Sequence, residues 1–541
     1  MLERTAGTTT GAPAADRPAT GSASPGVVLD GRSLDAATVA RIADGATPLS
    51  LCPKALEAME RTRRAAHRLA AEGARVYGRS TGVGAHRGLA VEEHDGAGHD
   101  LRLLLSHAGG VGEALPARRV RAMMVVRANQ LLAGGSGLGP ETATAVAQAL
   151  RAGVRPRVLE YGSVGTGDLT ALARLGLALF GHDTWTRDRA VSESLVPPDP
   201  FPERLPLRRG DALALLSSNA LTLGESALAR HDLGVPLRAA HLVAALALHA
   251  VDGSLEPYAP EVHEAHAHPA IAGVAARVRR LLGATTGRNA GVPGLPDRTP
   301  TRVQDPFGFR CFPQAHGPAM EAWSGLDRVL SIDLNSAAEN PLIGWDDITD
   351  RPVARHHGGF FTAPLTLALD QLALAVLGTA RLSAARLSAL GRPELTGLRS
   401  YLADASSAGS GMMILEYSAA SALAEIQACA TPASLGHVVL SQGMEEAATF
   451  APQAARKALR AAQAYRLVLA CELVAAVRAL RLRGTPPAPG TPAGRAYARA
   501  AAALDPDMRD RPLTDDVTVA AALLDGFAEL TGDAWDPARL G

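Results

Sequence analysis

The sequence contains three long stretches with helical periodicity, and they constrain the fold more than any other feature. In each of them apolar residues, mainly Ala and Leu, recur three and four positions apart with little internal Pro or Gly; these are residues 211–252, 364–391 and 454–483. A helix of this length has one broad apolar face, which must be covered by other helices of the chain or of a neighbouring subunit. We therefore expect a bundle of long helices.

The composition supports the same fold class. Hydrophobic residues make up 47% of the 541 residues but aromatic residues only 4%, so the core must consist mainly of Ala, Leu and Val. Such a core favours closely packed helices over a β-sandwich. Strands and helices do not alternate regularly along the chain, which argues against a doubly wound sheet. The predicted fold class is all-α, apart from minor elements.

The chain divides into four regions by composition. Residues 1–28 are rich in Gly, Ala, Thr, Ser and Pro and have no apolar run long enough for a signal peptide, so we expect a disordered tail. Residues 29–210 form an N-terminal region with polar, Gly-rich loops, and residues 211–482 hold the long helices of the central bundle. Residues 483–541 form a Pro-rich connector followed by a C-terminal helical segment.

Charge and short motifs exclude several classes of function. The 54 basic residues balance the 54 acidic residues, so no overall field attracts nucleic acid or an anionic membrane. The longest apolar run, near residues 242–251, is half a membrane span. Four separated cysteines without a CxxC pattern indicate reduced thiols in a cytoplasmic protein.

Two further motifs resemble known ligand-binding motifs but lack the spacing or the residues that these require. The histidines of residues 263–268 do not have the i, i+4 spacing of a helical zinc site. The glycines of residues 162–167 lack the Gly-Lys-Ser/Thr ending of a phosphate-binding loop. We therefore expect neither a metal nor a nucleotide, and a small molecule is the expected partner.

Five loops resemble those of the aromatic amino acid ammonia-lyases. Residues 162–169 read Gly-Ser-Val-Gly-Thr-Gly-Asp-Leu, where the family has Gly-Ser-Val-Gly-Ala-Ser-Gly-Asp-Leu and its Ala-Ser-Gly triad cyclises and loses water to give methylidene-imidazolone (MIO). The other four loops follow in the family order, at residues 76–84, 105–112, 304–314 and 334–342. The resemblance covers roughly residues 28–480. It implies the long central helix bundle of the fumarase/aspartase superfamily, and a homotetramer whose active sites combine loops of several chains.

The resemblance assigns two central roles. Tyr77 lies in a Gly-rich turn, which suits a phenol held at a cavity wall, and the family match makes it the general base. Arg310 offers a planar fork for a carboxylate and corresponds to the family's carboxylate anchor. The alternatives are a turn tyrosine hydrogen-bonded to backbone and a surface arginine.

Further contacts with the substrate are implied by the same loops. Gln304 corresponds to a polar residue near the substrate, Asn335 belongs to the Asn-Ser-x-x-Asp-Asn-Pro-like loop, and Glu445 resembles the glutamate near the amine. The Ser106-His107 pair matches the histidine-specific form of the selectivity segment and favours an imidazole or another polar ring. A core histidine and an exposed helix charge are the simpler interpretations of His107 and Glu445.

Several positions depart from the family pattern. Phe307 replaces a tyrosine, Phe361 replaces a histidine, and Glu446-Ala447 replaces Asp-His. Ser217 stands where an asparagine supports MIO, although Asn219 is close by. Losing one proton-transfer group typically costs ~10²–10⁴ in rate. So many changes at one site indicate a changed reaction.

Whether Gly165-Thr166-Gly167 forms an MIO-type group is open from the sequence. Small neighbours permit cyclisation and Thr can lose water, but the loop is one residue short and the extra methyl shields the carbon that the amine would attack. The main hypothesis is ammonia-lyase-like elimination of an amine from an aromatic or histidine-like α-amino acid, with or without this group. The alternatives are an MIO-independent lyase or isomerase acting on a substrate such as a betaine-type amino acid, and a non-catalytic binding scaffold.

Overall fold

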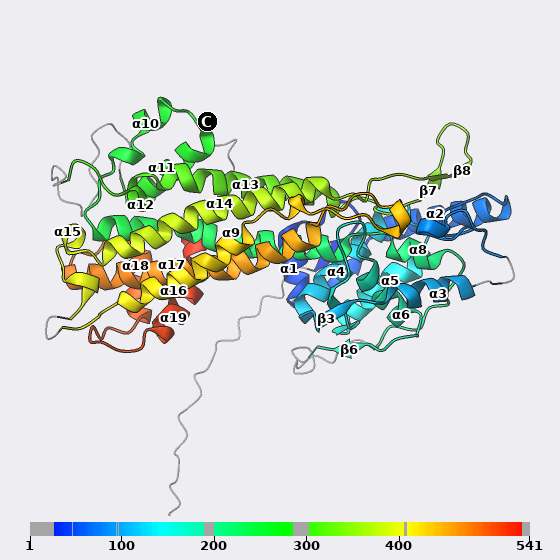
Figure 1. The fold of residues 1–541 in the computed structure, drawn as a ribbon, viewed down its shortest axis with the longest axis horizontal. Coiled ribbons are helices and arrows are strands. Elements are labelled where there is room, and N and C mark those ends of the chain that lie inside the picture. Colours follow the sequence, from blue (N-terminus) through cyan, green and yellow to red (C-terminus); the bar gives the residue numbers. More distant parts are fainter. Residues whose placement is uncertain are drawn as a thin grey trace, which may run out of the picture.

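A bundle of long helices dominates the computed structural model, which describes residues 26–45, 47–92, 95, 97–188, 200–284, 302–404 and 408–532. The helices that run along its long axis are α9 (Ala220–Ala250), α13 (Phe312–Asp333), α14 (Ala363–Leu390), α16 (Met413–Cys429) and α17 (Ala451–Arg483) (Figure 1). Helix α17 packs against α9, α14 and α16. The predicted all-α class and the central bundle are confirmed.

Small side chains bring the helices of the core close together. At Gly224 of α9, an added Cβ would lie 2.8 Å from the backbone carbon of Ala122 in α4 (Ala117–Ala133). A larger residue there would force the two helices apart, because their backbones are already nearly in contact. Tight packing of the helices therefore agrees with the low aromatic content of the chain.

One predicted helical stretch is interrupted in the structure. Residues 211–252 form α8 (Asp211–Leu216) and α9, separated by the non-helical residues Ser217–Asn219. Ser and Asn compete for local hydrogen bonds but do not by themselves end a helix. Contacts with distant segments stabilise the break: the carbonyl of Ser218 accepts from Asp168 N at 2.8 Å, and Asn219 Nδ2 donates to the carbonyl of Phe360 at 2.7 Å.

The N-terminal region covers one end of the bundle with shorter helices and four small sheets (Figure 1). Its remaining helices are α1 (Ala36–Ala43), α2 (Pro53–Ala71), α3 (Gly98–His107), α5 (Pro140–Arg151) and α6 (Leu169–Leu179). Strand β1 (Val27–Leu29) pairs in parallel with β2 (Leu49–Leu51). The antiparallel pairs are β3 (Val111–Ala114) with β5 (Leu159–Tyr161), β4 (Val154–Arg155) with β6 (Thr186–Arg187), and β7 (Leu342–Trp345) with β8 (Pro352–Arg355).

The opposite end of the bundle carries the other short helices. They are α10 (Pro260–Glu264), α11 (Pro269–Leu281), α12 (Phe307–Arg310), α15 (Pro393–Thr396), α18 (Pro492–Ala503) and α19 (Thr514–Leu530). The last two agree with the predicted C-terminal helical segment. The predicted tail, residues 1–28, lies outside the described residues except for its last three positions. The boundaries between the four predicted regions stay a prediction.

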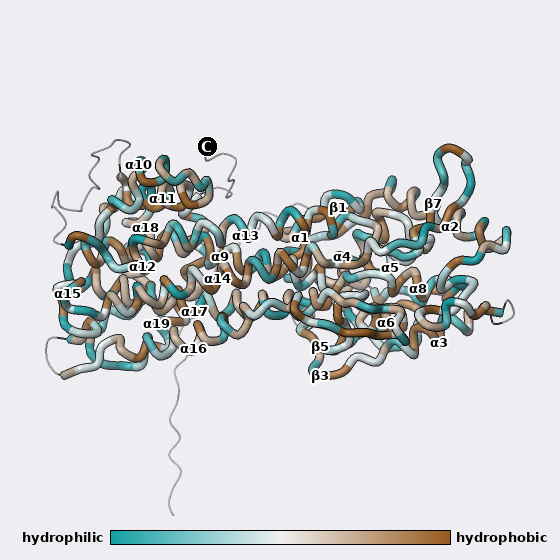
Figure 2. The backbone as a smooth tube through the Cα atoms, turned by 45° about the horizontal axis from the view of Figure 1, so that its top comes forward, coloured by the Kyte–Doolittle hydropathy of each residue, from teal (hydrophilic) through white to brown (hydrophobic). Residues whose placement is uncertain are grey.

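Two helical segments are long and apolar enough to cross a membrane by length and composition alone. They are Asp211–Ala250 and Ala363–Leu390, and 89% and 56% of their most apolar windows are buried inside the protein. Figure 2 shows the apolar residues of these helices along the centre of the molecule. Burial against other helices accounts for the composition of the first segment, whereas the second exposes apolar residues such as Leu367 and Leu374.

Candidate active site

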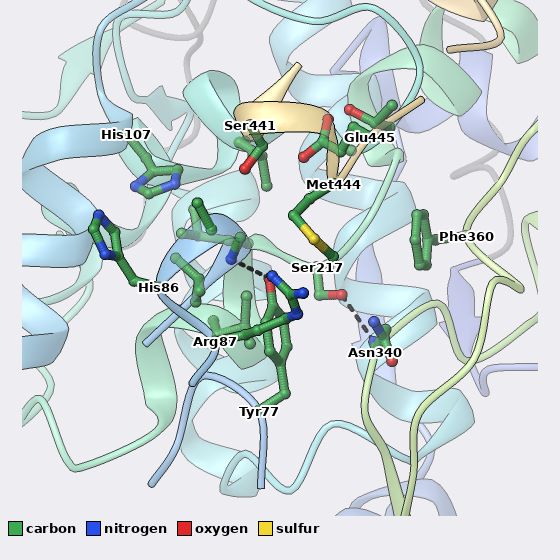
Figure 3. A pocket seen from close by; sticks show the side chains of 18 of the residues that line it. Tyr77, His86, Arg87, His107, Ser217, Asn340, Phe360, Ser441, Met444 and Glu445 are labelled. Carbon is green, nitrogen blue, oxygen red and sulfur yellow. Dashed lines mark hydrogen bonds between the residues drawn. The ribbon is translucent and has the colours of Figure 1, made fainter. Parts of the chain in front are cut away.

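A cavity of about 900 Å³ lies among the loops of the N-terminal region. Segments far apart in the sequence contribute to its wall: the Tyr77 turn, the 3-10 turn Gly84–His86, Thr166, the break at Ser217, and the loops around Phe360 and Glu445 (Figure 3). The last of these loops connects α16 to α17 and reaches the N-terminal region from the bundle. The cavity therefore brings together most of the segments singled out from the sequence.

Tyr77 is held at the cavity wall by its own turn. Gly78 has a φ of +67°, and an added Cβ there would lie 2.0 Å from Leu213 Cδ2, so only glycine fits beside the tyrosine. The phenolic oxygen accepts a hydrogen bond from Gly84 N at 2.7 Å, and the backbone N of Tyr77 donates to His356 Nε2 at 3.3 Å. A backbone N–H aimed at the phenolic oxygen stabilises negative charge there, which suits a base.

The loop of residues 162–168 is anchored on both sides of Thr166. Before it, Phe450 N donates to the carbonyl of Val164 at 2.8 Å and Thr449 Oγ1 donates to that of Gly165 at 3.2 Å. After it, the fully buried carboxylate of Asp168 accepts from Thr222 N at 2.8 Å and from Thr222 Oγ1 at 2.9 Å. Burial raises the pKa of Asp168 while these hydrogen bonds oppose the rise. Thr166 itself faces the cavity.

The surroundings of Thr166 differ from the family pattern for MIO. Gly165 has a φ of +93°, and a Cβ at this position would lie 2.0 Å from Thr449 Oγ1, so a residue with a side chain, such as alanine, would clash at position 165. The hydroxyl of Ser217, at the position of the supporting asparagine, already accepts from Asn340 N at 2.8 Å. The amide of Asn219 is turned to the carbonyl of Phe360 instead.

Two sides of the cavity differ in character. His107 lies on one side with His86, and its Nδ1 is 2.8 Å from the carbonyl of Leu103, which leaves Nε2 toward the cavity (Figure 3). On the other side lie Phe360, Met444 and Glu445, and Phe361 and Glu446 also line the cavity. Both His107 and Glu445 thus lie where the sequence analysis expected them, at the cavity.

Asn335 and Ser106 are predicted contact residues that do not line this cavity. Asn335 has its amide engaged elsewhere: Oδ1 accepts from Leu34 N at 2.8 Å, and Nδ2 donates to the carbonyl of Leu34 at 2.8 Å. We therefore correct its role to one of tying α13 to the N-terminal segment. Ser106 is exposed and its hydroxyl donates to the carbonyl of Leu103 at 3.0 Å, so it does not line the cavity either.

Sequence reasoning also missed several residues that line the cavity. Asn340 lies in it, with its Oδ1 accepting from His357 N at 3.0 Å. It belongs to the same Asn-Ser-x-x-Glu-Asn-Pro motif as Asn335, so the motif located the loop but did not mark Asn340 as the residue that lines the cavity. The other missed residues are His86, Arg87, His356, Phe360 and Met444; no pattern in the sequence distinguishes them.

Gln304 and Arg310 line a second cavity, of about 370 Å³, at the other end of the molecule. There the guanidinium carbon of Arg310 lies 4.4 Å from the centre of the Phe307 ring, and Phe307 is 63% exposed. The Nε of Arg310 is buried and has no hydrogen-bond partner among the described residues. Within one chain, Arg310, the expected carboxylate anchor, and Tyr77 therefore line different cavities.

The family model for aromatic amino acid lyases matches residues 34–502. The chain belongs to the aromatic amino acid lyase family. The histidine ammonia-lyase of Anaeromyxobacter sp. (strain K) is 34% identical over 517 residues, which cover 92% of this chain and 98% of the relative. That of Myxococcus xanthus is 32% identical over 512 residues and covers 93% and 97%. Membership in this family makes the protein a carbon–nitrogen lyase and leaves the scaffold hypothesis without support.

Solved structures agree with this assignment. Histidine ammonia-lyase from Trypanosoma cruzi matches with a TM-score of 0.81 at 25% identity, covering 93% of this chain and 94% of that one. A tyrosine aminomutase from Streptomyces globisporus matches with a TM-score of 0.82 at 25% identity and covers 94% and 98%. Ergothionase from Treponema denticola, at 23% identity and a TM-score of 0.81 with 94% and 99% covered, shares the fold.

Proposed function

We propose that this lyase eliminates the amine from an α-amino acid whose side chain is an aromatic or imidazole ring. Tyr77, as the phenolate, removes the β-proton; the electron pair of that C–H bond becomes the Cα=Cβ bond, and the amine leaves with the electrons of the C–N bond. The single observation that carries the proposal is the Tyr77 phenol at the cavity wall, with Gly84 N–H on its oxygen and His107 lining the same cavity. The histidine ammonia-lyase relatives support a ring of this kind.

The active unit is proposed to be a cytoplasmic homotetramer in which a neighbouring subunit supplies Arg310 and Gln304. The unpartnered Nε of Arg310 and the exposed ring of Phe307 support this arrangement, because a surface of this kind is more stable when another chain covers it. Co-expression of a Tyr77→Phe chain with an Arg310→Met chain tests it. We expect mixed assemblies to recover activity that neither variant has alone, because some sites then combine an intact Tyr77 with an intact Arg310.

The elimination is further proposed to proceed without MIO, from a substrate whose nitrogen leaves readily. Phe361, Met444 and Ala447 present no hydrogen-bonding group toward the amine, whereas the neighbouring Glu445 and Glu446 supply negative charge. Apolar and aromatic walls combined with carboxylates suit a quaternary ammonium, which carries a positive charge but has no hydrogen to donate. A betaine-type amino acid meets this requirement.

Intact mass and turnover together test the proposal. We expect the purified protein to have the mass of its translated sequence, and to convert N,N,N-trimethylhistidine, but not histidine, to the acrylate with release of trimethylamine. A mass lower by two waters, together with ammonia release from histidine, contradicts the MIO-independent mechanism. A β-amino acid product indicates isomerisation in place of elimination.

A further inference from the structure

A group of basic side chains in the cavity has no role in the reaction described above. His86 and Arg87 follow the Tyr77 turn and line the cavity together with His107 from α3. No hydrogen bond or ion pair of the His86 or Arg87 side chains occurs among the described residues, although both are polar groups at a cavity wall. We call these three residues the basic group.

The basic group and the two glutamates give the cavity an uneven distribution of charge. Figure 3 shows His86 and His107 on one side and Glu445 on the other, with the guanidinium of Arg87 projecting between them. The amine of a bound substrate is attracted to Glu445 and Glu446, and its α-carboxylate is assigned to Arg310 of a neighbouring subunit. The basic group therefore faces the remaining part of the substrate, its ring.

We infer that the substrate carries a second carboxylate on its ring and that Arg87, flanked by His86 and His107, binds it. This inference rests on the proposed function, since it deepens the substrate class of the same site. A guanidinium fork donates two parallel hydrogen bonds to a carboxylate, and the nearby His86 imidazole can add a further donor. A ring carboxylate would give the Arg87 cation a partner that a neutral ring does not supply.

Binding of two acrylates that differ by one carboxylate tests the inference. Cinnamate has the product's α-carboxylate only, and 4-carboxycinnamate has a second one on the ring. By isothermal titration of the full-length protein, we expect 4-carboxycinnamate to bind about tenfold tighter than cinnamate, the lower end of the range for a charge-assisted hydrogen bond at an accessible site. Arg87→Met should bring this ratio to about one.

Arg64→Met provides the matched control, because Arg64 is likewise exposed and lies outside the cavity. The control should keep the tenfold preference despite the same loss of charge. Equal affinity of the wild type for both acrylates, or a preference that survives Arg87→Met, overturns the inference and leaves the proposed function in place. If the wild type binds neither acrylate, the inference is overturned and a phenyl ring is ruled out, while the imidazole substrate of the proposed function is left in place.

Discussion

Replacing Gly165 by alanine should destabilise the protein, and the structure allows the size of the effect to be worked out. Gly165 has a φ of +93°, where a residue with a Cβ is strained by roughly 1–2 kcal/mol. The new Cβ would lie 2.0 Å from Thr449 Oγ1 and 3.1 Å from Phe450 N. The Thr449 hydroxyl would have to turn away, losing its hydrogen bonds to the carbonyl of Gly165 and to Thr362 Oγ1.

A buried polar group that loses its partner costs about 1–3 kcal/mol, so the total for Gly165→Ala is about 2–5 kcal/mol. Thr449→Ala removes the clashing hydroxyl at its own cost of about 1–2 kcal/mol, within the same range for a lost buried hydrogen bond. Since part of the penalty of Gly165→Ala is the clash itself, the double variant should lose less than the sum of the two.

Denaturant unfolding followed by circular dichroism, applied to both single variants and the double variant, measures these differences. Gly88→Ala is the control, because a Cβ at Gly88 meets no atom within 4 Å; it should change stability by no more than about 0.5 kcal/mol. The reasoning is refuted if Gly165→Ala costs no more than Gly88→Ala, or if the effects of Gly165→Ala and Thr449→Ala are additive. Either result would mean that the loop has room for a side chain at position 165.

Three further predictions concern the base and two buried charges. Tyr77→Phe should lower kcat by ~10²–10⁴ with substrate still bound; kinetics and ligand titration check this, and unchanged turnover would remove Tyr77 as the base. Burial raises the pKa of Glu225 to about 7 from an ordinary 4.5, although Arg119 opposes the rise. The folded protein therefore keeps a proton that the unfolded chain loses, so stability should fall as pH rises from about 4.5 to 7. Denaturation midpoints of the wild type and of Glu225→Gln, measured at pH 5 and at pH 7.5, test this. The loss of stability between the two pH values should be smaller in Glu225→Gln than in the wild type; an equal loss in both proteins would contradict the raised pKa of Glu225. Arg127 Nη1 donates to Glu339 Oε1 at 2.8 Å with both side chains almost fully buried. Glu339→Ala leaves that cation unpaired and should cost about 3–5 kcal/mol of unfolding free energy, more than Glu339→Gln, and equal losses would show that the ion pair is unimportant.

Local patterns predicted the long helices well where residues such as proline and glycine mark the helix ends. The stretches 364–391 and 454–483 correspond to α14 and α17 within three residues at either end. Both helices have a proline at their second residue, and Gly484, with a φ of +65°, ends α17; such signals are visible in the sequence. The break at Ser217–Asn219 was missed because its partners, Asp168, Asn340 and Phe360, are distant in the sequence.

The candidate site was predictable only in part, for a similar reason. Motifs located the loops that line the cavity, but they did not distinguish Asn340, which faces it, from Asn335, which binds Leu34. Both are asparagines of one motif, and only the direction of each side chain in the folded protein separates them. No sequence pattern singles out His86 and Arg87, because only the folded structure shows which residues share the cavity with them.

By itself the sequence determined the helical class, the family, and the loops in which the reaction must take place. These are properties of short segments, and periodicity and motif spacing record them directly. The tertiary structure decided which loop residues share one cavity, that Arg310 lies at the far end of the same chain, and that position 165 has no space for a side chain. Such facts depend on how distant segments pack against one another, and a linear pattern does not contain that information.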